Sequence, residues 1–269
     1  MGFSSGLTFL KYPNNAKPCS LGVILENMFK QTDDIRDYVF ALCKATKDIN
    51  AKQYAYKELI GTGFLIGNNG YALTAAHVIE QLLEGKQSDE DVMVGLFQSN
   101  SEWHVFEIIE YEKHPSEDVG IIKIQGQGWK SFLTITDIPQ NSTCEYHCWG
   151  YPHETAKELR KLDENALDRP ELVFTQGYIR RRISRELYPT MIYRGIQFYE
   201  VSETIGGGGS GGPIILKNSV GKKVWQAIGI YIGEKEDRNI GYAVRAEAFA
   251  NWIPKILKKP IIEEAKNDA

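Results

Sequence analysis

The sequence has few cysteines, no long apolar run and no excess of positive charge. Only four cysteines occur in 269 residues, and none flanks the two motifs around His77 and Ser210 that are described below. A disulfide framework is therefore not expected, which favours a reducing compartment. No apolar run approaches the roughly 18 residues that a membrane span needs. Residues 1–20 also lack the basic start and apolar stretch of a secretory signal, so we expect a cytoplasmic protein with no membrane partner.

The charge balance gives no reason to expect nucleic acid as a partner, because the formal net charge is −4. The densest basic cluster, Arg180-Arg181-Arg182 with Arg185, is interpreted as a solvated face of a strand or turn. The length allows one large domain or two small ones with a substantial core.

The most unusual stretch is 206–213, which reads Gly-Gly-Gly-Gly-Ser-Gly-Gly-Pro. Taken alone, it is typical of a flexible glycine linker, in which a serine usually does nothing. Pro213 and the apolar residues after it, however, turn the loop directly into a predicted buried strand. Glycine tolerates positive φ and close backbone approach. The loop therefore also suits a nucleophilic Ser210 whose neighbouring N–H groups face a developing oxyanion.

Strand patterns dominate from about residue 54 to residue 245. About six strand candidates lie before residue 125, and Asn-Asn-Gly at 68–70 predicts a hairpin turn between two of them. A second set of about six short strands follows, with turns between them. Two such sets predict an all-β fold of two antiparallel barrels or sandwiches.

Helical spacing of apolar residues predicts helices at both ends of the chain. Residues 21–48 are predicted to be helical, with a second apolar run from Ile35 to Cys43. Packing on the main body is the favoured interpretation of this segment, and a docking or regulatory role is the alternative. Residues 246–259 are predicted to form a closing helix that Pro254 kinks or interrupts.

Three residues carry the candidate chemistry. His77 follows small residues at the end of a predicted strand, and Asp118 comes just before the apolar segment 119–124. Alone, such a histidine is more often structural and such an aspartate is more often a turn cap. Together with Ser210 they offer a nucleophile, a base and an acid that orients the base.

At these residues the sequence resembles the trypsin-like serine proteases of the chymotrypsin fold, especially the HtrA-like bacterial branch that lacks disulfides. The resemblance spans roughly residues 58–245, and we see no PDZ module in the sequence. The chain order His, Asp, Ser matches the chymotrypsin arrangement and differs from that of subtilisin. The motifs that carry the resemblance are Gly-Thr-Gly-Phe-Leu-Ile at 61–66, Thr-Ala-Ala-His at 74–77, Asp-Val-Gly-Ile-Ile-Lys at 118–123, Gly-Tyr-Pro at 150–152, Thr-Gln-Gly at 175–177 and Gly-Gly-Ser-Gly-Gly-Pro at 208–213.

The resemblance implies a double antiparallel β-barrel with the triad in the cleft between the barrels. It implies that Ser210 is the nucleophile, that His77 is the general base and acid, and that Asp118 orients the imidazole. The N–H groups of Gly208 and Ser210 form the implied oxyanion hole. The expected domains are an N-terminal helical extension at 1–55, a protease domain at 56–245 with barrels at about 56–138 and 139–245, and a C-terminal helix and tail at 246–269.

Position 209 departs from the digestive trypsins. They carry an aspartate just before the serine, whereas this sequence has Gly209, so activation by a newly freed N-terminus is not expected. The run of four glycines also leaves the backbone of the predicted oxyanion hole with little conformational restraint. Our hypothesis is that the free protein populates a collapsed hole, from which a partner or a substrate selects the competent form.

The substrate pocket is inferred from the resemblance. No acid lies at its predicted base, so a small or medium apolar P1 side chain is expected. Glu203 and Glu234 lie close in sequence and keep a basic preference open. The predicted base and first wall comprise Thr204, Ile205, Tyr231, Ile232 and Gly233, and the second wall is 241–243.

Cys144, His147 and Cys148 place three metal-ligating side chains within five residues. On a strand, the two cysteines face one way and the histidine faces the other, which is poor geometry for one ion. Buried free thiols are the favoured interpretation, so neither a metal nor another cofactor is predicted.

Three functions stay open at this level. The leading one is a serine endopeptidase that cleaves a protein or peptide substrate through an acyl-enzyme. The second is a catalytically silent protease-fold module that binds a peptide, although all three triad residues are present. The third is a regulated protease whose residues 1–55 bind a regulatory protein and whose cleavage follows a signal.

Overall fold

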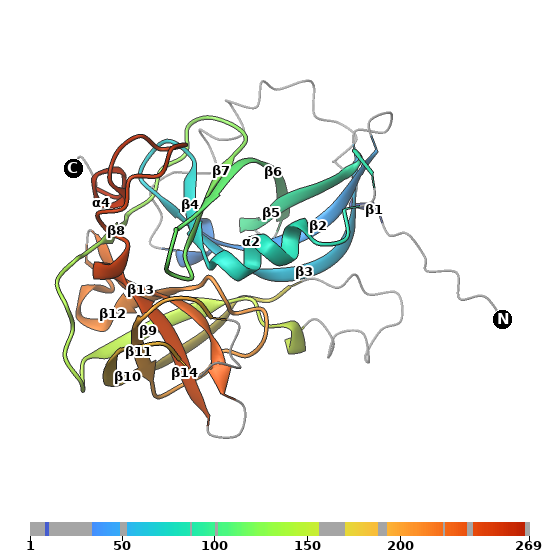
Figure 1. Cartoon of the computed structure of the whole chain (residues 1–269). Helices are drawn as coiled ribbons and strands as arrows, with labels where there is room; N and C mark the ends of the chain where they lie inside the picture. Colours follow the sequence, from blue (N-terminus) through green and yellow to red (C-terminus); the bar gives the residue numbers. More distant parts are fainter. Residues whose placement is uncertain are drawn as a thin grey trace.

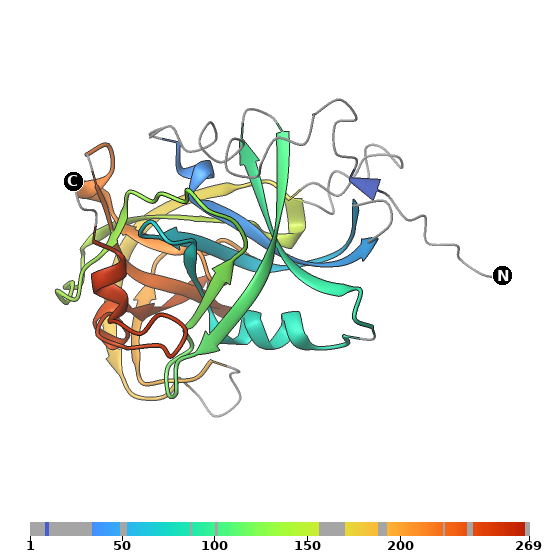
Figure 2. The ribbon, with the colours of Figure 1, turned by 90° about the horizontal axis from the view of Figure 1, so that it is seen from above.

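The computed structural model consists of two β-barrels with a few short helices. It describes residues 9–10, 34–48, 53–86, 88–99, 102–155, 170–187, 193–222, 224–235 and 239–266. Figure 1 shows the barrel of the first half of the chain above the barrel of the second half. Seen from above in Figure 2, the C-terminal helix α4 (Ile261–Glu264) lies at the end of the molecule opposite to strand β1 (Phe9–Leu10).

The first barrel is an antiparallel sheet closed on itself. Its strand order is β3-β2-β5-β6-β7-β4, and the pairing of β3 with β4 closes the barrel, while β1 extends the sheet at β3. The turn between β3 and β4 contains Gly70 at φ +71°, as the Asn-Asn-Gly hairpin prediction requires. The strands are β2 (Val39–Asp48), β3 (Gln53–Ile66), β4 (Tyr71–Thr74), β5 (Asp91–Ser99), β6 (Glu102–Lys113) and β7 (Gly120–Ile124).

The second barrel repeats the same closed architecture. Its order is β12-β9-β10-β11-β14-β13, and β12 pairs with β13 to close it. The short strand β8 (Leu133–Ile135) comes from the connection between the barrels and pairs in parallel with β13. The strands are β9 (Glu145–Gly150), β10 (Val173–Ser184), β11 (Gln197–Val201), β12 (Pro213–Leu216), β13 (Trp225–Lys235) and β14 (Ile240–Arg245). The predicted all-β double barrel is therefore confirmed.

The helix prediction for residues 21–48 is wrong where the structure describes it. Residues Val39–Asp48 form strand β2, which pairs with both β3 and β5, after a single turn of 3-10 helix at Ile35–Asp37. The consecutive residues 39–43 are all fully buried, so both faces of this strand are covered. A short apolar run that is buried on both faces has no alternation that would separate a strand from a buried helix. The first barrel thus begins inside the segment assigned to the N-terminal extension, and the remaining part of that helix prediction lies outside the described residues.

The predicted closing helix at 246–259 is also wrong. The segment has one 3-10 turn at Ala246–Ala248 followed by turns, and the α-helix is the short α4 at Ile261–Glu264. Pro254 cannot supply the N–H that a continuous helix needs. The segment instead crosses back to the first barrel, where the Tyr71 hydroxyl donates a 2.9 Å hydrogen bond to the Ile256 carbonyl.

Each barrel has an apolar interior. The larger core cluster includes Phe40, Phe64 and Phe97 of the first barrel, and the smaller one includes Tyr146, Cys148 and Tyr199 of the second.

Among the described residues, no helix is long and apolar enough to cross a membrane. The arginines at 180–182 are exposed on β10 and form ion pairs with Glu200 and Glu247.

Candidate active site

His77 is held at the start of a helix. It is the second residue of α2 (Ala76–Leu83), which directly follows β4. It was predicted to lie at the end of a strand, but the strand ends at Thr74 and His77 belongs to the helix that follows. The residue is 8% exposed, so its ring lies in a site from which most water is excluded.

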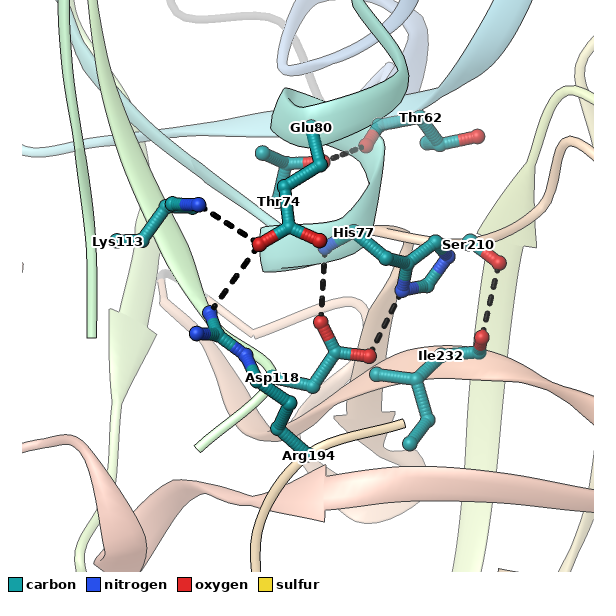
Figure 3. Close-up of polar contacts among 9 residues, drawn as sticks. All are labelled: Thr62, Thr74, His77, Glu80, Lys113, Asp118, Arg194, Ser210 and Ile232. Carbon is teal, nitrogen blue, oxygen red and sulfur yellow. Dashed lines mark hydrogen bonds and ion pairs between the residues drawn. The ribbon is translucent and has the colours of Figure 1, made fainter. Parts of the chain in front are cut away.

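Asp118 fixes the His77 ring through two hydrogen bonds. Its Oδ2 lies 2.7 Å from His77 Nδ1, and its Oδ1 accepts the backbone N–H of His77 at 2.9 Å (Figure 3). Because a carboxylate can only accept, the Nδ1 atom carries the proton and Nε2 is left as the basic nitrogen. Asp118 is almost completely buried, and its backbone N–H donates a 3.1 Å hydrogen bond to the Arg194 carbonyl.

Ser210 comes from the loop before β12, and the structure brings it next to the His77 ring (Figure 3). Its hydroxyl does not point at the imidazole. It donates a 3.0 Å hydrogen bond to the carbonyl of Ile232 on β13. Within the described part of the chain, no hydrogen bond joins Ser210 to His77. The three predicted residues thus lie in one region of the structure, with the serine hydroxyl bonded to the second barrel.

The loop around Ser210 presents two backbone N–H groups without an internal acceptor. Neither the N–H of Gly208 nor that of Ser210 donates to another group among the described residues. In a planar trans peptide the C=O and N–H point in opposite directions. The Gly207 carbonyl accepts the His153 N–H at 2.6 Å, and the Gly209 carbonyl accepts the Gly212 N–H at 3.0 Å. Both candidate oxyanion-hole N–H groups are therefore held facing away from these bonds.

The residues predicted for the substrate pocket lie near one another. The Tyr231 hydroxyl accepts the Ile205 N–H at 3.4 Å and donates to Glu234 Oε2 at 3.1 Å, and the same oxygen accepts the Gly206 N–H at 3.3 Å. Ile205 and Tyr231 also belong to the core of the second barrel. Ile232 is fully buried, while Thr204 bonds to Asn239 at the surface. Glu234 is thus in contact with the predicted pocket residues. It is one of the two glutamates for which the sequence left a basic P1 preference open.

Tyr193 is a residue that the sequence analysis missed. Its ring centroid lies 5.6 Å from that of His77, and the backbone of Glu234 hydrogen-bonds to its hydroxyl. Burial, with a smaller contribution from the charge of Asp118, raises the pKa of Tyr193 to about 12. The side chain thus spans from the base on the first barrel to β13 on the second. No local pattern in the sequence could have identified it, because the contact depends on how the two barrels meet.

His147 and Cys148 lie on β9, and Cys144 directly precedes this strand. Cys148 lies in the core of the second barrel, where burial raises the pKa of its thiol, and His147 packs edge-on against Trp149 and Phe174. Within the ranges that the structure describes, no three His, Cys, Asp or Glu side chains gather as a metal site would need.

A separate cavity of ≈ 220 Å³ opens on the first barrel beside the end of α2. Leu82, Met93 and Tyr111 line it, together with Lys57, which is paired with Asp91. No triad residue borders this cavity, so it has no place in the chemistry of the site.

Two closed β-barrels that carry histidine and aspartate on the first and serine on the second define a protein with the chymotrypsin-like protease fold. The sequence matches the trypsin family over residues 45–253, and the chain belongs to that family. No curated protein matches its sequence.

Solved structures with the same fold include several proteases. The Rv3671c protease from M. tuberculosis in its active form is 19% identical, with 79% of this chain and 77% of that chain covered and a TM-score of 0.52. Deg5 is 16% identical over 83% of this chain and 88% of its own, with a TM-score of 0.53. The MamO protease domain from Magnetospirillum magneticum is 12% identical over 80% and 94%, with a TM-score of 0.51. At such identities the likeness shows the fold.

Proposed function

We propose that the protein is a serine endopeptidase that cleaves peptide bonds through an acyl-enzyme, with His77, Asp118 and Ser210 as its catalytic triad. The observation that carries the proposal is the buried His77–Asp118 pair, joined by two hydrogen bonds. It lies beside the loop of Ser210, in which the N–H groups of Gly208 and Ser210 have no acceptor among the described residues. A structural histidine does not need its imidazole tautomer fixed next to a serine. A general base does.

The proposed reaction begins when the Ser210 hydroxyl turns from the Ile232 carbonyl to Nε2 of His77. The imidazole takes the proton as Oγ attacks the substrate carbonyl, and Asp118 stabilises the imidazolium. The N–H groups of Gly208 and Ser210 stabilise the oxyanion of the tetrahedral intermediate. His77 then protonates the leaving amine, and water hydrolyses the acyl-enzyme by the reverse sequence of proton transfers.

The observed serine orientation is compatible with this reaction. Leaving the Ile232 carbonyl exchanges one hydrogen bond for another, and a single neutral hydrogen bond is worth about 0.5–1.5 kcal/mol net. That is small beside the 8–23 kcal/mol by which enzymes typically lower a barrier. A rotation about the serine χ1 angle is therefore a minor cost.

The loop geometry argues against the collapsed hole that its four glycines suggested. The carbonyls of Gly207 and Gly209 are both engaged, and their bonds restrain the next N–H groups, which have no acceptor among the described residues. We therefore propose a hole that is formed in the free protein.

Control by a regulatory protein through residues 1–55 stays a prediction. Its test must spare β2, because this strand is part of the first barrel. A deletion of residues 1–33 removes the short strand β1 at the edge of the sheet but leaves strands β2 to β7 intact. Loss of a binding partner in that variant supports the regulated protease, and full activity with no partner lost argues against it.

The substrate preference and the location are also proposals. A small or medium apolar P1 side chain is expected, with a basic P1 as the alternative because Glu234 contacts the predicted pocket residues. A reducing compartment such as the cytoplasm is supported by the free thiols of Cys43, Cys144 and Cys148. A peptide-library cleavage profile dominated by Lys or Arg at P1 would overturn the apolar preference.

The competing function is a silent protease-fold module that binds a peptide. The bond from Ser210 to the Ile232 carbonyl favours it, since this serine is not hydrogen-bonded to the proposed base. A fluorophosphonate probe separates the two functions. Labelling of the wild type that disappears in both His77→Ala and Ser210→Ala shows an active triad. No labelling of the folded wild type, alone and after adding peptide substrates, supports the silent module.

A further inference from the structure

Thr62, on β3 of the first barrel, uses one hydroxyl to hold two parts of the second barrel. The side chain is fully buried, and its Oγ1 donates to the Gly208 carbonyl at 2.9 Å. The same oxygen accepts the backbone N–H of Tyr151 at 2.9 Å. The hydroxyl thus links the loop that carries Ser210 to the turn that follows β9.

The backbone of Thr62 makes two more bonds at the same place. Its N–H donates to the Ser210 carbonyl at 2.8 Å, and its carbonyl accepts the Thr74 hydroxyl at 2.7 Å (Figure 3). Thr74 ends β4, three residues before His77. Thr62 therefore lies between the segment that carries the base and the loop that carries the nucleophile.

These bonds complete a series along the glycine loop. Five consecutive carbonyls, those of residues 206–210, each accept one hydrogen bond. The donors are Gly209, His153 and Gly212 for the carbonyls of residues 206, 207 and 209, while Thr62 supplies both of the others. A chain of glycines has wide conformational freedom. Here its orientation is set by these bonds, and two of the five come from a single residue of the opposite barrel.

The conformation of Gly208 depends on the peptide planes on either side of its Cα, and its N–H lies in the first of them, with the Gly207 carbonyl. The Gly207 carbonyl is held by His153 and the Gly208 carbonyl by the Thr62 hydroxyl. Fixing both peptide planes fixes φ and ψ of the glycine between them, which adopts φ +95°. The Gly209 N–H of the second plane also donates to the Gly206 carbonyl at 3.0 Å. Without the hydroxyl, the plane keeps only that bond, so Gly208 loses the one restraint that comes from the opposite barrel.

We propose that Thr62 is a positioning residue for catalysis. Its hydroxyl holds the Gly208 carbonyl, and through it the conformation of the glycine whose N–H serves the proposed oxyanion hole, while its backbone links the Ser210 loop to the segment that precedes His77. The inference rests on the proposed peptidase function. The Thr62 hydroxyl affects the stability of the transition state, because the oxyanion develops there and is not present in the bound substrate.

The test compares Thr62→Val, which keeps the shape and loses the hydroxyl, with Thr62→Ser, which keeps the hydroxyl. Since small displacements of catalytic groups can cost about 100-fold, we expect Thr62→Val to lower kcat by about 10- to 100-fold with little change in KM. Thr62→Ser should restore most of kcat. A peptide aldehyde, whose adduct places an oxyanion in the hole, should lose affinity for Thr62→Val by the same factor as kcat/KM.

Thr134→Val is the matched control, because the Thr134 hydroxyl also donates to a backbone carbonyl, that of Trp225, away from the loop. We expect its kcat to equal that of the wild type. A Thr62→Val enzyme with wild-type kcat, or one in which KM and aldehyde affinity change without kcat, overturns the inference. If Thr62→Val does not fold, Thr62→Cys replaces it. Its weaker hydrogen bonds should give a kcat between those of Ser210→Ala and Thr62→Ser, and a kcat equal to that of Thr62→Ser overturns the inference.

Failure of the peptidase proposal gives a different result. In that case the wild type itself neither cleaves peptides nor reacts with a fluorophosphonate. A wild type that does both, beside an unaffected Thr62→Val, leaves the peptidase in place and removes only the role of Thr62.

Discussion

The two barrels share one architecture but hold their parts of the site in different ways. The first barrel fixes His77 through side-chain bonds, since Asp118 is 1% exposed and binds both the ring and the backbone N–H of the histidine. The second barrel fixes its loop through backbone bonds, because six of the residues at 206–212 are glycines without side chains. A base needs a fixed ring, whereas an oxyanion hole needs fixed N–H groups.

The difference extends to the state of each group before substrate binds. The His77–Asp118 pair already has the geometry of a working base. The Ser210 hydroxyl bonds instead to the Ile232 carbonyl of its own barrel. In the proposed mechanism the base is therefore already oriented, whereas the serine must rotate its side chain to reach it.

The largest effect is expected on the first barrel, for Asp118→Asn. An amide can donate to Nδ1 and stabilise the wrong tautomer, so kcat should fall by about 10⁴-fold with the fold intact. The measurement is kcat on a cleaved peptide, with the melting temperature as the control for folding. A variant that keeps more than a tenth of the activity would show that the pair is structural.

A smaller effect is expected on the second barrel, for Gly208→Ala. A Cβ there would lie 2.5 Å from the Tyr151 carbonyl oxygen, in a residue with φ +95°. The loop must shift, and the loss of one hole donor should lower kcat by about 100- to 1000-fold.

The neighbouring glycine provides the control for that variant. A Cβ at Gly207 would meet its nearest atom, His153 Nδ1, at 3.6 Å, which is an ordinary contact. Gly207→Ala should therefore keep most of the activity. Equal loss in both variants would mean that the loop needs flexibility, and the collapsed-hole hypothesis would gain support over a preformed hole.

The smallest effect concerns the turn that leads into Asp118. His114 accepts backbone N–H bonds from Ser116 and Glu117 at its Nδ1, and its ring packs on Trp252. Burial, together with the charge of Arg194, lowers the pKa of His114. The neutral form is thus the one that the fold favours, because a proton at Nδ1 would displace both donors.

The sign of the pH effect follows from this lowered pKa. The stabilisation by neutral His114 is complete above the unfolded value of about 6.5 and is lost as the pH falls through the lower folded value. The melting temperature of the wild type should fall over this acidic range by about 2–4 °C for each kcal/mol lost. His114→Gln should show a smaller fall, and identical pH profiles would contradict the prediction.

Part of the site could be predicted because its motifs are local. Asn-Asn-Gly forms a hairpin through its own φ preferences, and a serine among glycines at the start of an apolar run indicates an exposed loop entering a buried strand. The two helix predictions failed where local pattern was ambiguous. Residues 39–43 are buried on both faces, and the segment around Pro254 is held by contacts with the first barrel, such as that of Tyr71 with Ile256.

The sequence by itself determined the chemical types and their order along the chain: histidine, aspartate and serine in motifs of the trypsin family, and a loop of glycines that can turn backbone N–H groups toward a ligand. Only the tertiary structure decided that Tyr193 reaches the His77 ring, that Thr62 holds the Gly208 carbonyl, and that Ser210 bonds to Ile232. The physical reason is distance along the chain. Turn and strand preferences act within a few residues, whereas these contacts join segments from both barrels and exist only once the barrels pack.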